Sequence, residues 1–240
     1  MKLEHVFIKD IAKMIDHSLL HPTMTDEIVL AGLALSKEYD VATACVKPYS
    51  VKLAAGMLAG TDVGVCAVIG FPAGNSTTKM KITEARQVMA DGATEVDVVI
   101  NIGKALGQDW TYVSDEIKAV NDVVVAGGAI LKVIFEVDYL EDAHIIRLCE
   151  ICSQHKVAFV KTSTGYGMVK HPNGFYTYQG ATDHVVKLMR KHSAPGVQVK
   201  AAGGVRTLED TLRVRELGAS RIGATATKAI LEEAQKRGYE

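Results

Sequence analysis

The chain has 240 residues, of which 48% are hydrophobic and 23% are charged. This composition is typical of a folded protein with a substantial core, and we expect a single domain over residues 1–240. The net charge of -1 and the pI of about 6.7 give no electrostatic reason to expect a nucleic acid or a membrane as partner, which favours a small-molecule partner. Four cysteines are too few for a disulfide framework in a chain of this size, so we expect a reducing, cytoplasmic location.

Short runs rich in β-branched residues alternate with longer segments of helical periodicity. Residues 1–10 mix both charge signs with apolar positions, which predicts a short N-terminal helix and not a signal peptide. The predicted strands are residues 14–19, 41–47, 63–71, 95–103, 130–137, 157–165, 197–205 and 221–227. The predicted helices between them are residues 25–37, 50–59, 77–91, 113–126, 140–155, 181–192 and 208–217.

Eight strand–helix repeats in about 240 residues predict an α/β fold, a (β/α)8 TIM barrel with a short N-terminal helix. A doubly wound sheet is the alternative, but at this length it would usually carry fewer strands. Residues 167–180, which begin and end with a glycine, interrupt the alternation with Pro172 and Asn173, which predicts an irregular insertion. No segment approaches the roughly 18 apolar residues that a membrane span needs.

One lysine, Lys161, lies in the middle of the apolar run 157–165. Burying an unpaired ammonium group costs several kcal/mol, so this position needs an explanation. A salt bridge, a snorkelling position at a strand end or a role as a nucleophilic amine would each provide one.

Other polar residues also lie inside the predicted strands. In a barrel, inward-pointing side chains alternate along each strand, and catalytic groups gather at the C-terminal strand ends. The residues in question are Asp16, Cys45, Lys47, Asp97, Asn101, Lys132, Glu136, Lys161, Ser163 and Lys200. Their convergence indicates either a structural ion-pair network or a catalytic cluster, and we favour the catalytic cluster.

Amine catalysis on a carbonyl group uses such a set of residues. An unperturbed lysine has a pKa of about 10.4, so almost none of it is the free amine near neutral pH. We expect Lys200, on the neighbouring strand, to disfavour protonation of Lys161. An iminium at Lys161 would act as an electron sink, with Asp97 as the general acid/base, supported by Lys132 or Asp16.

Small residues end the last two predicted strands, Gly203 and Gly204 in one and Gly223, Ala224 and Thr225 in the other. Barrels commonly bind a phosphate group at this place through backbone N–H groups and a helix N-terminus. Alternatively, the glycines only turn the chain.

Seven motifs resemble the deoxyribose-phosphate aldolase family, in order and over nearly the whole chain. They are residues 16–20 (DHSLL), 44–48 (ACVKP), 70–74 (GFPAG), 95–103 (EVDVVINIG), 132–136 (KVIFE), 159–165 (FVKTSTG) and 199–206 (VKAAGGVR). The resemblance implies a metal-free, cofactor-free class I aldolase on a (β/α)8 barrel. This family interconverts 2-deoxy-D-ribose 5-phosphate with acetaldehyde and D-glyceraldehyde 3-phosphate.

The resemblance also assigns roles to individual residues. Lys161 would form the Schiff base, Asp97 would donate and accept protons, and Lys200 would tune the amine. The phosphate would be bound by Thr164, Gly165, Gly203, Gly204, Gly223, Ala224 and Thr225. Family members are often dimers, so a homodimer is one expectation. Two further hypotheses come from the residues alone: Cys45 lines the aldehyde pocket, and Tyr239 reaches the barrel mouth on a mobile tail to help protonate the enamine.

The chain departs from the family pattern at two places. Ala226 follows Thr225 where a second hydroxyl residue is usual, and the loop 166–180 is longer than the compact glycine-rich version. The loop could contact phosphate, act as a lid or be an exposed insertion. A related aldolase with an altered donor or acceptor, and a sugar-phosphate-binding barrel without catalysis, therefore remain as alternatives.

Overall fold

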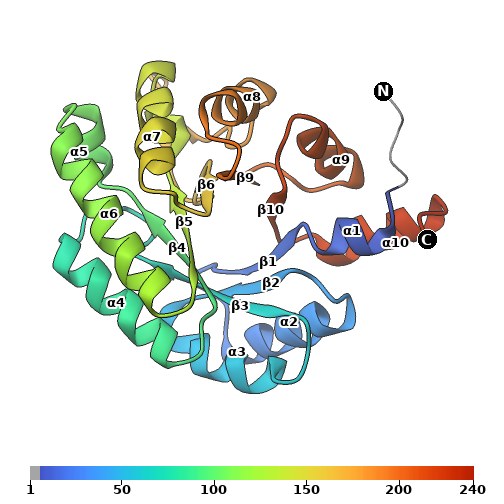
Figure 1. Cartoon of the computed structure of the whole chain (residues 1–240). Helices are drawn as coiled ribbons and strands as arrows, with labels where there is room; N and C mark the ends of the chain where they lie inside the picture. The colour runs from blue at the N-terminus through green and yellow to red at the C-terminus, as the bar shows by residue number, and fades with distance from the viewer. Residues whose placement is uncertain (1–5) are drawn as a thin grey trace.

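Eight parallel strands form a closed barrel in the computed structural model, which describes residues 6–240 (Figure 1). The ring order is β1, β2, β3, β4, β5, β6, β9, β10 and back to β1. The strands are β1 (Ile15–Leu19), β2 (Thr43–Val46), β3 (Gly64–Ile69), β4 (Glu95–Val99), β5 (Ile130–Ile134), β6 (Phe159–Lys161), β9 (Gln198–Ala202) and β10 (Arg221–Ala224). The predicted (β/α)8 barrel is confirmed.

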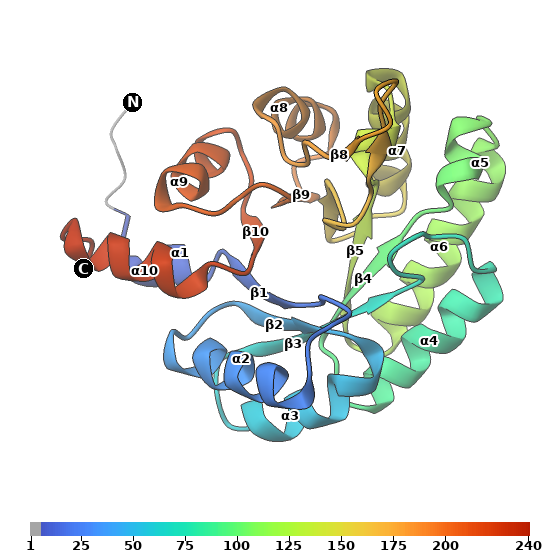
Figure 2. The same cartoon turned by 180° about the vertical axis from the view of Figure 1, so that it is seen from behind.

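Helices surround the barrel and cover its outer surface (Figures 1 and 2). The helices are α1 (Ile8–Ala12), α2 (Asp26–Glu38), α3 (Val51–Leu58), α4 (Thr78–Ala90), α5 (Ile102–Leu106), α6 (Trp110–Ala126), α7 (Asp142–Gln154), α8 (Asp183–His192), α9 (Leu208–Glu216) and α10 (Thr227–Lys236), with 3-10 turns η1 (Pro48–Ser50) and η2 (Val137–Tyr139). The predicted N-terminal helix begins only at Ile8, and residues 1–5 lie outside the described part of the chain. Helices α5 and α10 were not predicted.

Threonine side chains begin several of the helices. The hydroxyl groups of Thr25, Thr77, Thr182 and Thr207 each accept a hydrogen bond from a backbone N–H in the first turn. These bonds satisfy N–H groups that have no partner within the helix. Apolar side chains of the strands and helices then fill the layer between barrel and helices.

Several barrel strands end earlier than predicted because the backbone turns soon after them. Glu136, two residues after β5, has a φ of 58°, and Gly203, directly after β9, has a φ of 87°. Neither conformation continues a strand. The C-terminal strand ends therefore lead directly into turns that surround the mouth of the barrel.

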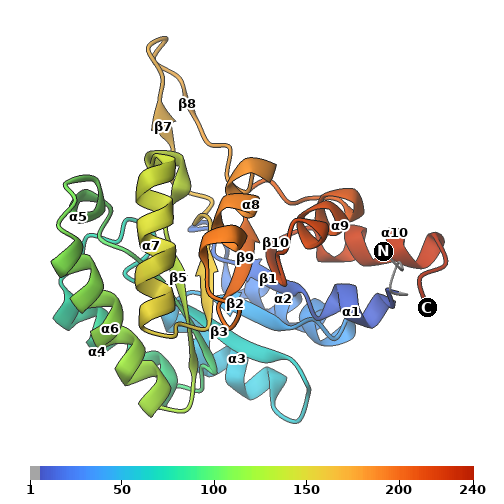
Figure 3. The same ribbon diagram turned by 45° about the horizontal axis from the view of Figure 1, so that its top comes forward.

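The insertion 167–180 is a two-stranded antiparallel hairpin, β7 (Val169–Lys170) and β8 (Tyr176–Thr177), which differs from the predicted irregular segment. It projects away from the barrel above the C-terminal strand ends (Figure 3). The ring of His171 bonds the Thr177 hydroxyl at 2.5 Å across the hairpin. Most of the hairpin is exposed.

The chain end lies beside α1, at the opposite side of the barrel from the strand C-termini. The N–H of Ile8 donates to the carbonyl oxygen of Glu240 at 2.8 Å. Figures 1 and 2 show α1 and α10 side by side there. Within residues 6–240, none of the helices combines the length and apolar character needed to cross a bilayer.

Candidate active site

A cavity of about 230 Å³ opens at the C-terminal ends of the barrel strands. Most of the predicted site residues line it: Asp16, Cys45, Lys161, Thr164, Gly165, Lys200, Gly203, Gly204, Gly223, Ala224 and Thr225. The wall also includes residues that sequence reasoning did not assign, namely Ser18, Leu20, His21 and Arg206, together with Tyr166 and Tyr178 of the longer loop. Asp97 and Lys132 are fully buried behind the wall.

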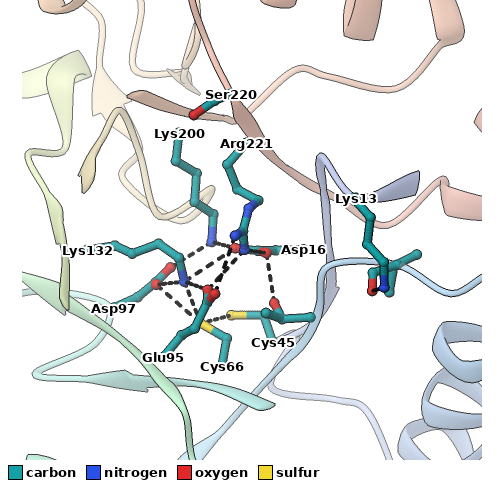
Figure 4. Close-up of polar contacts among 12 residues, drawn as sticks. Lys13, Asp16, Cys45, Cys66, Glu95, Asp97, Lys132, Lys200, Ser220 and Arg221 are labelled. Atoms are coloured by element: carbon teal, nitrogen blue, oxygen red, sulfur yellow. Dashed lines mark hydrogen bonds and ion pairs between the residues drawn. The ribbon is translucent and has the colours of Figure 1, made fainter. Parts of the chain in front are cut away.

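Asp97 is the centre of the polar cluster, and its two carboxylate oxygens contact different groups. Oδ2 accepts from the Nζ atoms of Lys161 and Lys200, each at 2.8 Å. Oδ1 accepts from Lys132 Nζ at 2.8 Å and from the Cys66 thiol at 3.2 Å. Figure 4 shows the contacts that Asp97 makes with Lys132 and Lys200. The carboxylate thus holds three ammonium groups around one point.

Lys161 and Lys200 occupy directly paired positions of β6 and β9. The two strands are neighbours in the ring although 36 residues of chain, which include the hairpin, separate Lys161 from Gln198. Both side chains are at most 3% exposed, and both line the cavity. The pairing brings the two amines to the same carboxylate oxygen.

Asp16 joins the first strand of the barrel to the last two. Its Oδ2 lies 2.5 Å from Lys200 Nζ, and its Oδ1 accepts from Arg221 at 2.6 Å and from the Thr43 hydroxyl at 2.7 Å. Lys132 Nζ lies further away, at 3.4 Å from Oδ2. Asp16 therefore orients Lys200 on the side opposite Asp97 (Figure 4).

Glu95 and Arg221 complete the cluster at the N-terminal ends of β4 and β10, and sequence reasoning missed both. Glu95 Oε2 contacts Lys132 at 2.6 Å and Arg221 at 2.9 Å. Glu95 lies two residues before Asp97, so the same alternation that placed Asp97 inside the barrel applies to it. Arg221 likewise lies two residues before Gly223 of the cavity wall. The spacing of two residues along a strand could therefore have identified Glu95 and Arg221 as inward-pointing.

The cluster contains four cationic side chains, Lys132, Lys161, Lys200 and Arg221, and three carboxylates, Asp16, Glu95 and Asp97. Its formal charge is therefore +1 when all groups are ionised. Lys161 has one carboxylate partner among the described residues, Lys200 has two, and Lys132 has three. By this geometry Lys161 is the cation least tightly held.

Burial and charge act in opposite directions on the buried groups of this cluster. Burial alone would raise the pKa of Asp97, but the charges of Lys132, Lys161 and Lys200 hold that pKa well below its usual range. Burial alone would lower the pKa of Lys200, but the charges of Asp16 and Asp97 raise it. The balance keeps Asp97 ionised and Lys200 protonated in the resting site.

Cys45 and Cys66 lie at paired positions of β2 and β3, with their sulfur atoms 3.5 Å apart. Cys45 lines the cavity as expected, whereas Cys66 lies behind it. The sulfur atoms and an Asp97 oxygen fall within 4.8 Å of one another, a spacing that could hold a metal ion. However, Lys132 Nζ already contacts both Cys66 Sγ at 3.2 Å and Asp97 Oδ1, so an ammonium group occupies the neighbourhood where a cation would bind.

The even spacing between Lys132 and Glu136 predicts that both point into the barrel. Instead, Glu136 lies beyond the end of β5 and supports the cavity wall. Its carboxylate accepts from the backbone N–H of Thr164 at 3.1 Å and from the Thr164 hydroxyl. A Cβ atom on Gly167 would meet this carboxylate at 2.4 Å, so the loop lies directly against it. Glu136 thereby holds the turn that follows Lys161.

Tyr239 is a correction to the sequence interpretation. Its side chain packs, half-buried, against the core beside α1 and α10, and its N–H bonds the Ala234 carbonyl oxygen at 3.1 Å. Helix α10 runs back from the mouth along the barrel, so the short segment after it ends at the far side. In this structure the phenol therefore lies away from Lys161.

The fold and the site together define a (β/α)8-barrel enzyme with a lysine amine at the mouth of the barrel and glycine-rich turns beside it. A family model described as "DeoC/LacD family aldolase" matches residues 11–233. The chain belongs to this family of aldolases.

Relatives of known name agree with this assignment. The chain is 50% identical over 228 residues to a deoxyribose-phosphate aldolase from Rhodopirellula baltica, covering 95% of this chain and 90% of that protein. It is 44% identical over 232 residues to one from Caldanaerobacter subterraneus, covering 96% of each. A solved deoxyribose-phosphate aldolase from Aeropyrum pernix, described as tetrameric, superimposes with a TM-score of 0.84 at 29% identity, covering 96% of this chain and 93% of that one.

Proposed function

We propose that the enzyme reversibly cleaves 2-deoxy-D-ribose 5-phosphate to acetaldehyde and D-glyceraldehyde 3-phosphate through a Schiff base at Lys161. The observation that carries this proposal is the Lys161 amine, which lines the cavity and contacts one carboxylate oxygen of Asp97 at 2.8 Å. The identity to named deoxyribose-phosphate aldolases supports the substrate. The residues of the site carry the reaction without a metal or a cofactor in this proposal.

In the first step, the Lys161 ammonium passes one proton to a water molecule and the neutral amine attacks the C1 aldehyde carbon of the open-chain sugar. That proton returns to the carbinolamine hydroxyl, which leaves as water to give an iminium. The iminium nitrogen carries the positive charge that the ammonium carried before. Asp97 Oδ2 therefore faces a cation at the same position before and after the reaction, and it stabilises the iminium without reorganisation. This is a preorganised site for a cationic intermediate.

In the second step, the 3-hydroxyl group loses its proton and the C2–C3 bond breaks. C3 becomes the carbonyl carbon of glyceraldehyde 3-phosphate, and the bonding electrons move to C2 to give an enamine on Lys161. Protonation of C2 regenerates an iminium, whose hydrolysis by water releases acetaldehyde and the free amine. The sequence of steps returns Lys161 to its starting state.

Two groups are assigned to the proton transfers. Lys200 is the protonated group at the cavity wall, and Asp97 is the ionised acceptor behind the wall. Because Asp97 does not line the cavity, we assign it proton exchange through Lys200 or a water molecule, while Lys132 and Asp16 hold Asp97 and Lys200 in place. This refines the simpler role of a direct general acid/base.

The phosphate end of the substrate is assigned to the turns after β9 and β10. Gly203 and Gly204 both have positive φ values, 87° and 85°, and line the cavity with Gly223, Ala224 and Thr225. Thr164 and Gly165 line the same end from the turn after β6. Helix α10 begins at Thr227, so its N-terminus faces this end and favours an anion.

Borohydride reduction in the presence of acetaldehyde tests the Schiff base directly. We expect one ethyl group on Lys161, located by peptide mass spectrometry, and no labelling in Lys161→Ala. The exposed lysine variant Lys170→Ala is the matched control and should label as the wild type does. Full activity in Lys161→Ala, or an adduct only on another lysine, would disprove the assignment.

Location and assembly follow the same proposal. All four cysteines are buried and unbridged, which supports action in the reducing cytoplasm. We propose a homo-oligomer, with the homodimer as the simplest form, and light scattering of the purified chain would measure its mass. Activity on unphosphorylated deoxyribose at the same efficiency as on the phosphorylated sugar would instead favour the alternative of an altered specificity.

A further inference from the structure

We propose that Tyr178, which directly follows strand β8 of the hairpin, determines specificity for the phosphate group of the substrate together with Arg206. This inference rests on the proposed function, since it assumes that the phosphorylated end of the substrate lies at the turns after β9 and β10. The residues that carry it come from the inserted segment and the adjacent turn.

The backbone after the hairpin is fixed from two sides. The Asp138 carboxylate, in η2, accepts hydrogen bonds from the N–H of Gln179 and from the N–H of Gly180, the latter at 3.0 Å. On the other side, Gly180 packs directly against Gly203, so that a Cβ atom would meet the Gly203 carbonyl oxygen at 2.6 Å. The N–H of Ala181 donates to the same carbonyl oxygen at 3.0 Å. Tyr178 therefore emerges from an anchored segment, although the hairpin itself projects into solvent (Figure 3).

The Tyr178 side chain turns toward the cavity and does not point away with the hairpin. It is half-buried and belongs to the same cavity wall as Lys161. Its ring atom Cε2 lies 3.5 Å from the position that a Cβ atom on Gly203 would occupy. Its hydroxyl oxygen lies 3.5 Å from Arg206 Nη2. The phenol thus covers the glycine turn and extends to the guanidinium group.

The chemistry of this pair fits a phosphate group. A phenol O–H and a guanidinium group are both donors to phosphate oxygens, and the guanidinium adds charge and a planar donor geometry. Ala226, at the start of α10, offers no hydroxyl group, so Thr225 is the single hydroxyl residue of the turn between Gly223 and Ala226. A donor from the insertion supplies what this turn lacks.

Substrate pairs that differ only in the phosphate group test the proposal. The kcat/KM values for 2-deoxyribose 5-phosphate and for 2-deoxyribose are measured with the wild type and with Tyr178→Phe. We expect the ratio of the two values to fall about tenfold, as for the loss of one hydrogen bond to a charged group, mainly through KM for the phosphorylated sugar. Arg206→Gln should lower the same ratio. The matched control is Tyr176→Phe, whose exposed ring lies on the hairpin, and it should keep the wild-type ratio.

Calorimetric titration with inorganic phosphate provides a second measurement that needs no turnover. Tyr178→Phe should weaken phosphate binding about tenfold, whereas Tyr176→Phe should not. A wild-type substrate ratio and wild-type phosphate affinity in Tyr178→Phe would overturn the proposal. A wild type that cleaves neither sugar would refute the proposed function instead, and the titration would still decide the role of Tyr178.

Discussion

Lys161 and Lys200 donate to the same oxygen atom, Oδ2 of Asp97, from directly paired positions of two neighbouring strands. They differ in their other partners, because Lys200 also contacts Asp16 at 2.5 Å, whereas Asp97 is the single ion-pair partner of Lys161 within residues 6–240. In the proposed mechanism, Lys200 stays a cation and Lys161 supplies the reacting amine. The division of roles between two identical side chains follows from this difference.

Replacing Asp97 should damage both activity and folding. In Asp97→Asn, three buried ammonium groups lose their shared carboxylate, so the free energy of unfolding should fall by about 3–5 kcal/mol. The value of kcat should fall by about two to four orders of magnitude. Urea unfolding and steady-state kinetics measure the two effects. Asp62→Asn, at an exposed aspartate, serves as control. Wild-type stability in Asp97→Asn would contradict the description of the cluster.

His17 should make stability depend on pH. Burial lowers its pKa from 6.5 to about 4, and its Nδ1 bonds the Thr227 hydroxyl at 2.8 Å. The unfolded chain therefore binds a proton more readily than the folded one between these values. Neutral His17 contributes about 3 kcal/mol to the free energy of unfolding above pH 6.5. This contribution is lost as the pH falls to about 4.

Unfolding free energies measured from pH 8 to pH 4 test this prediction. His17→Gln should flatten the acid side of the profile relative to the wild type. His184→Gln, at an exposed histidine, should leave the slope as it is. An identical slope in the wild type and in His17→Gln would show that other groups cause the dependence.

Tyr166 separates the active-site cavity from a second, mostly apolar cavity of about 370 Å³. Leu20 and Tyr166 line both cavities, and the Tyr166 ring packs edge-on against Phe71 at 5.6 Å between centroids. In Tyr166→Ala the two cavities should merge and admit donor aldehydes longer than acetaldehyde. Each added methylene should then gain up to about fourfold in relative kcat/KM.

Competition between acetaldehyde, propanal and butanal as donors measures this gain. Tyr49→Ala is the control, because Tyr49 lines the outer part of the second cavity and does not separate the two. An unchanged donor preference in Tyr166→Ala would show that the second cavity remains closed to the substrate.

Lys81 and Glu116 form a buried ion pair away from the cavity, at 2.7 Å, and Lys81 also donates to the Val99 carbonyl oxygen at 2.8 Å. Lys81→Met leaves the Glu116 carboxylate buried without its cation, so the free energy of unfolding should fall by about 3–5 kcal/mol. The double variant Lys81→Met, Glu116→Leu should recover part of this loss. If the loss of unfolding free energy in the double variant equals the sum of the losses in the two single variants, the two residues do not act as a pair.

Tyr239 should have no part in turnover. Because its phenol packs beside α1 at the far side of the barrel, Tyr239→Phe should keep kcat within about twofold of the wild type. Removal of residues 237–240 should lower stability, since Arg237 pairs with Glu209 and Glu233, but should leave turnover per folded molecule intact. A tenfold loss of kcat in Tyr239→Phe would require the tail to move to the mouth.

Local patterns predicted most of the barrel. Every barrel strand falls within a predicted β-branched run, because burial on both faces of a parallel strand selects such residues continuously. The predicted runs extended too far where a single backbone angle ends the strand, as at Glu136 and Gly203. The glycine pair at 203 and 204 is a signal for such a turn, whereas no residue type beside Glu136 indicates its angle.

Polar residues within the predicted strands also indicated cavity residues on β1, β2, β6 and β9, whereas those on β10 were indicated by the small residues at its end. The contacts of Glu95 with Arg221 could not be predicted, because they depend on how strands 126 residues apart in sequence meet inside the barrel. The longer loop, which contains Tyr178, was expected to contact phosphate, act as a lid or be an exposed insertion. The direction of the Tyr178 side chain could not be predicted, since it depends on the anchoring of Gly180 between Asp138 and Gly203. Tyr239 was misassigned because the sequence does not show at which end of the barrel the tail finishes.

The seam between β1 and β10, where the ring closes, is bridged by the contact of Asp16 with Arg221. A polypeptide cut before β9 would retain Lys161 and Asp97 but would lack Lys200 and Arg221, so that Asp16 would keep Lys132 but lose its two nearer cations. The cluster around Asp97 is therefore complete only when the C-terminal strands have docked onto the first. Recovery of activity during refolding thus reports the docking of the two chain ends, and it should lag behind the formation of the helices.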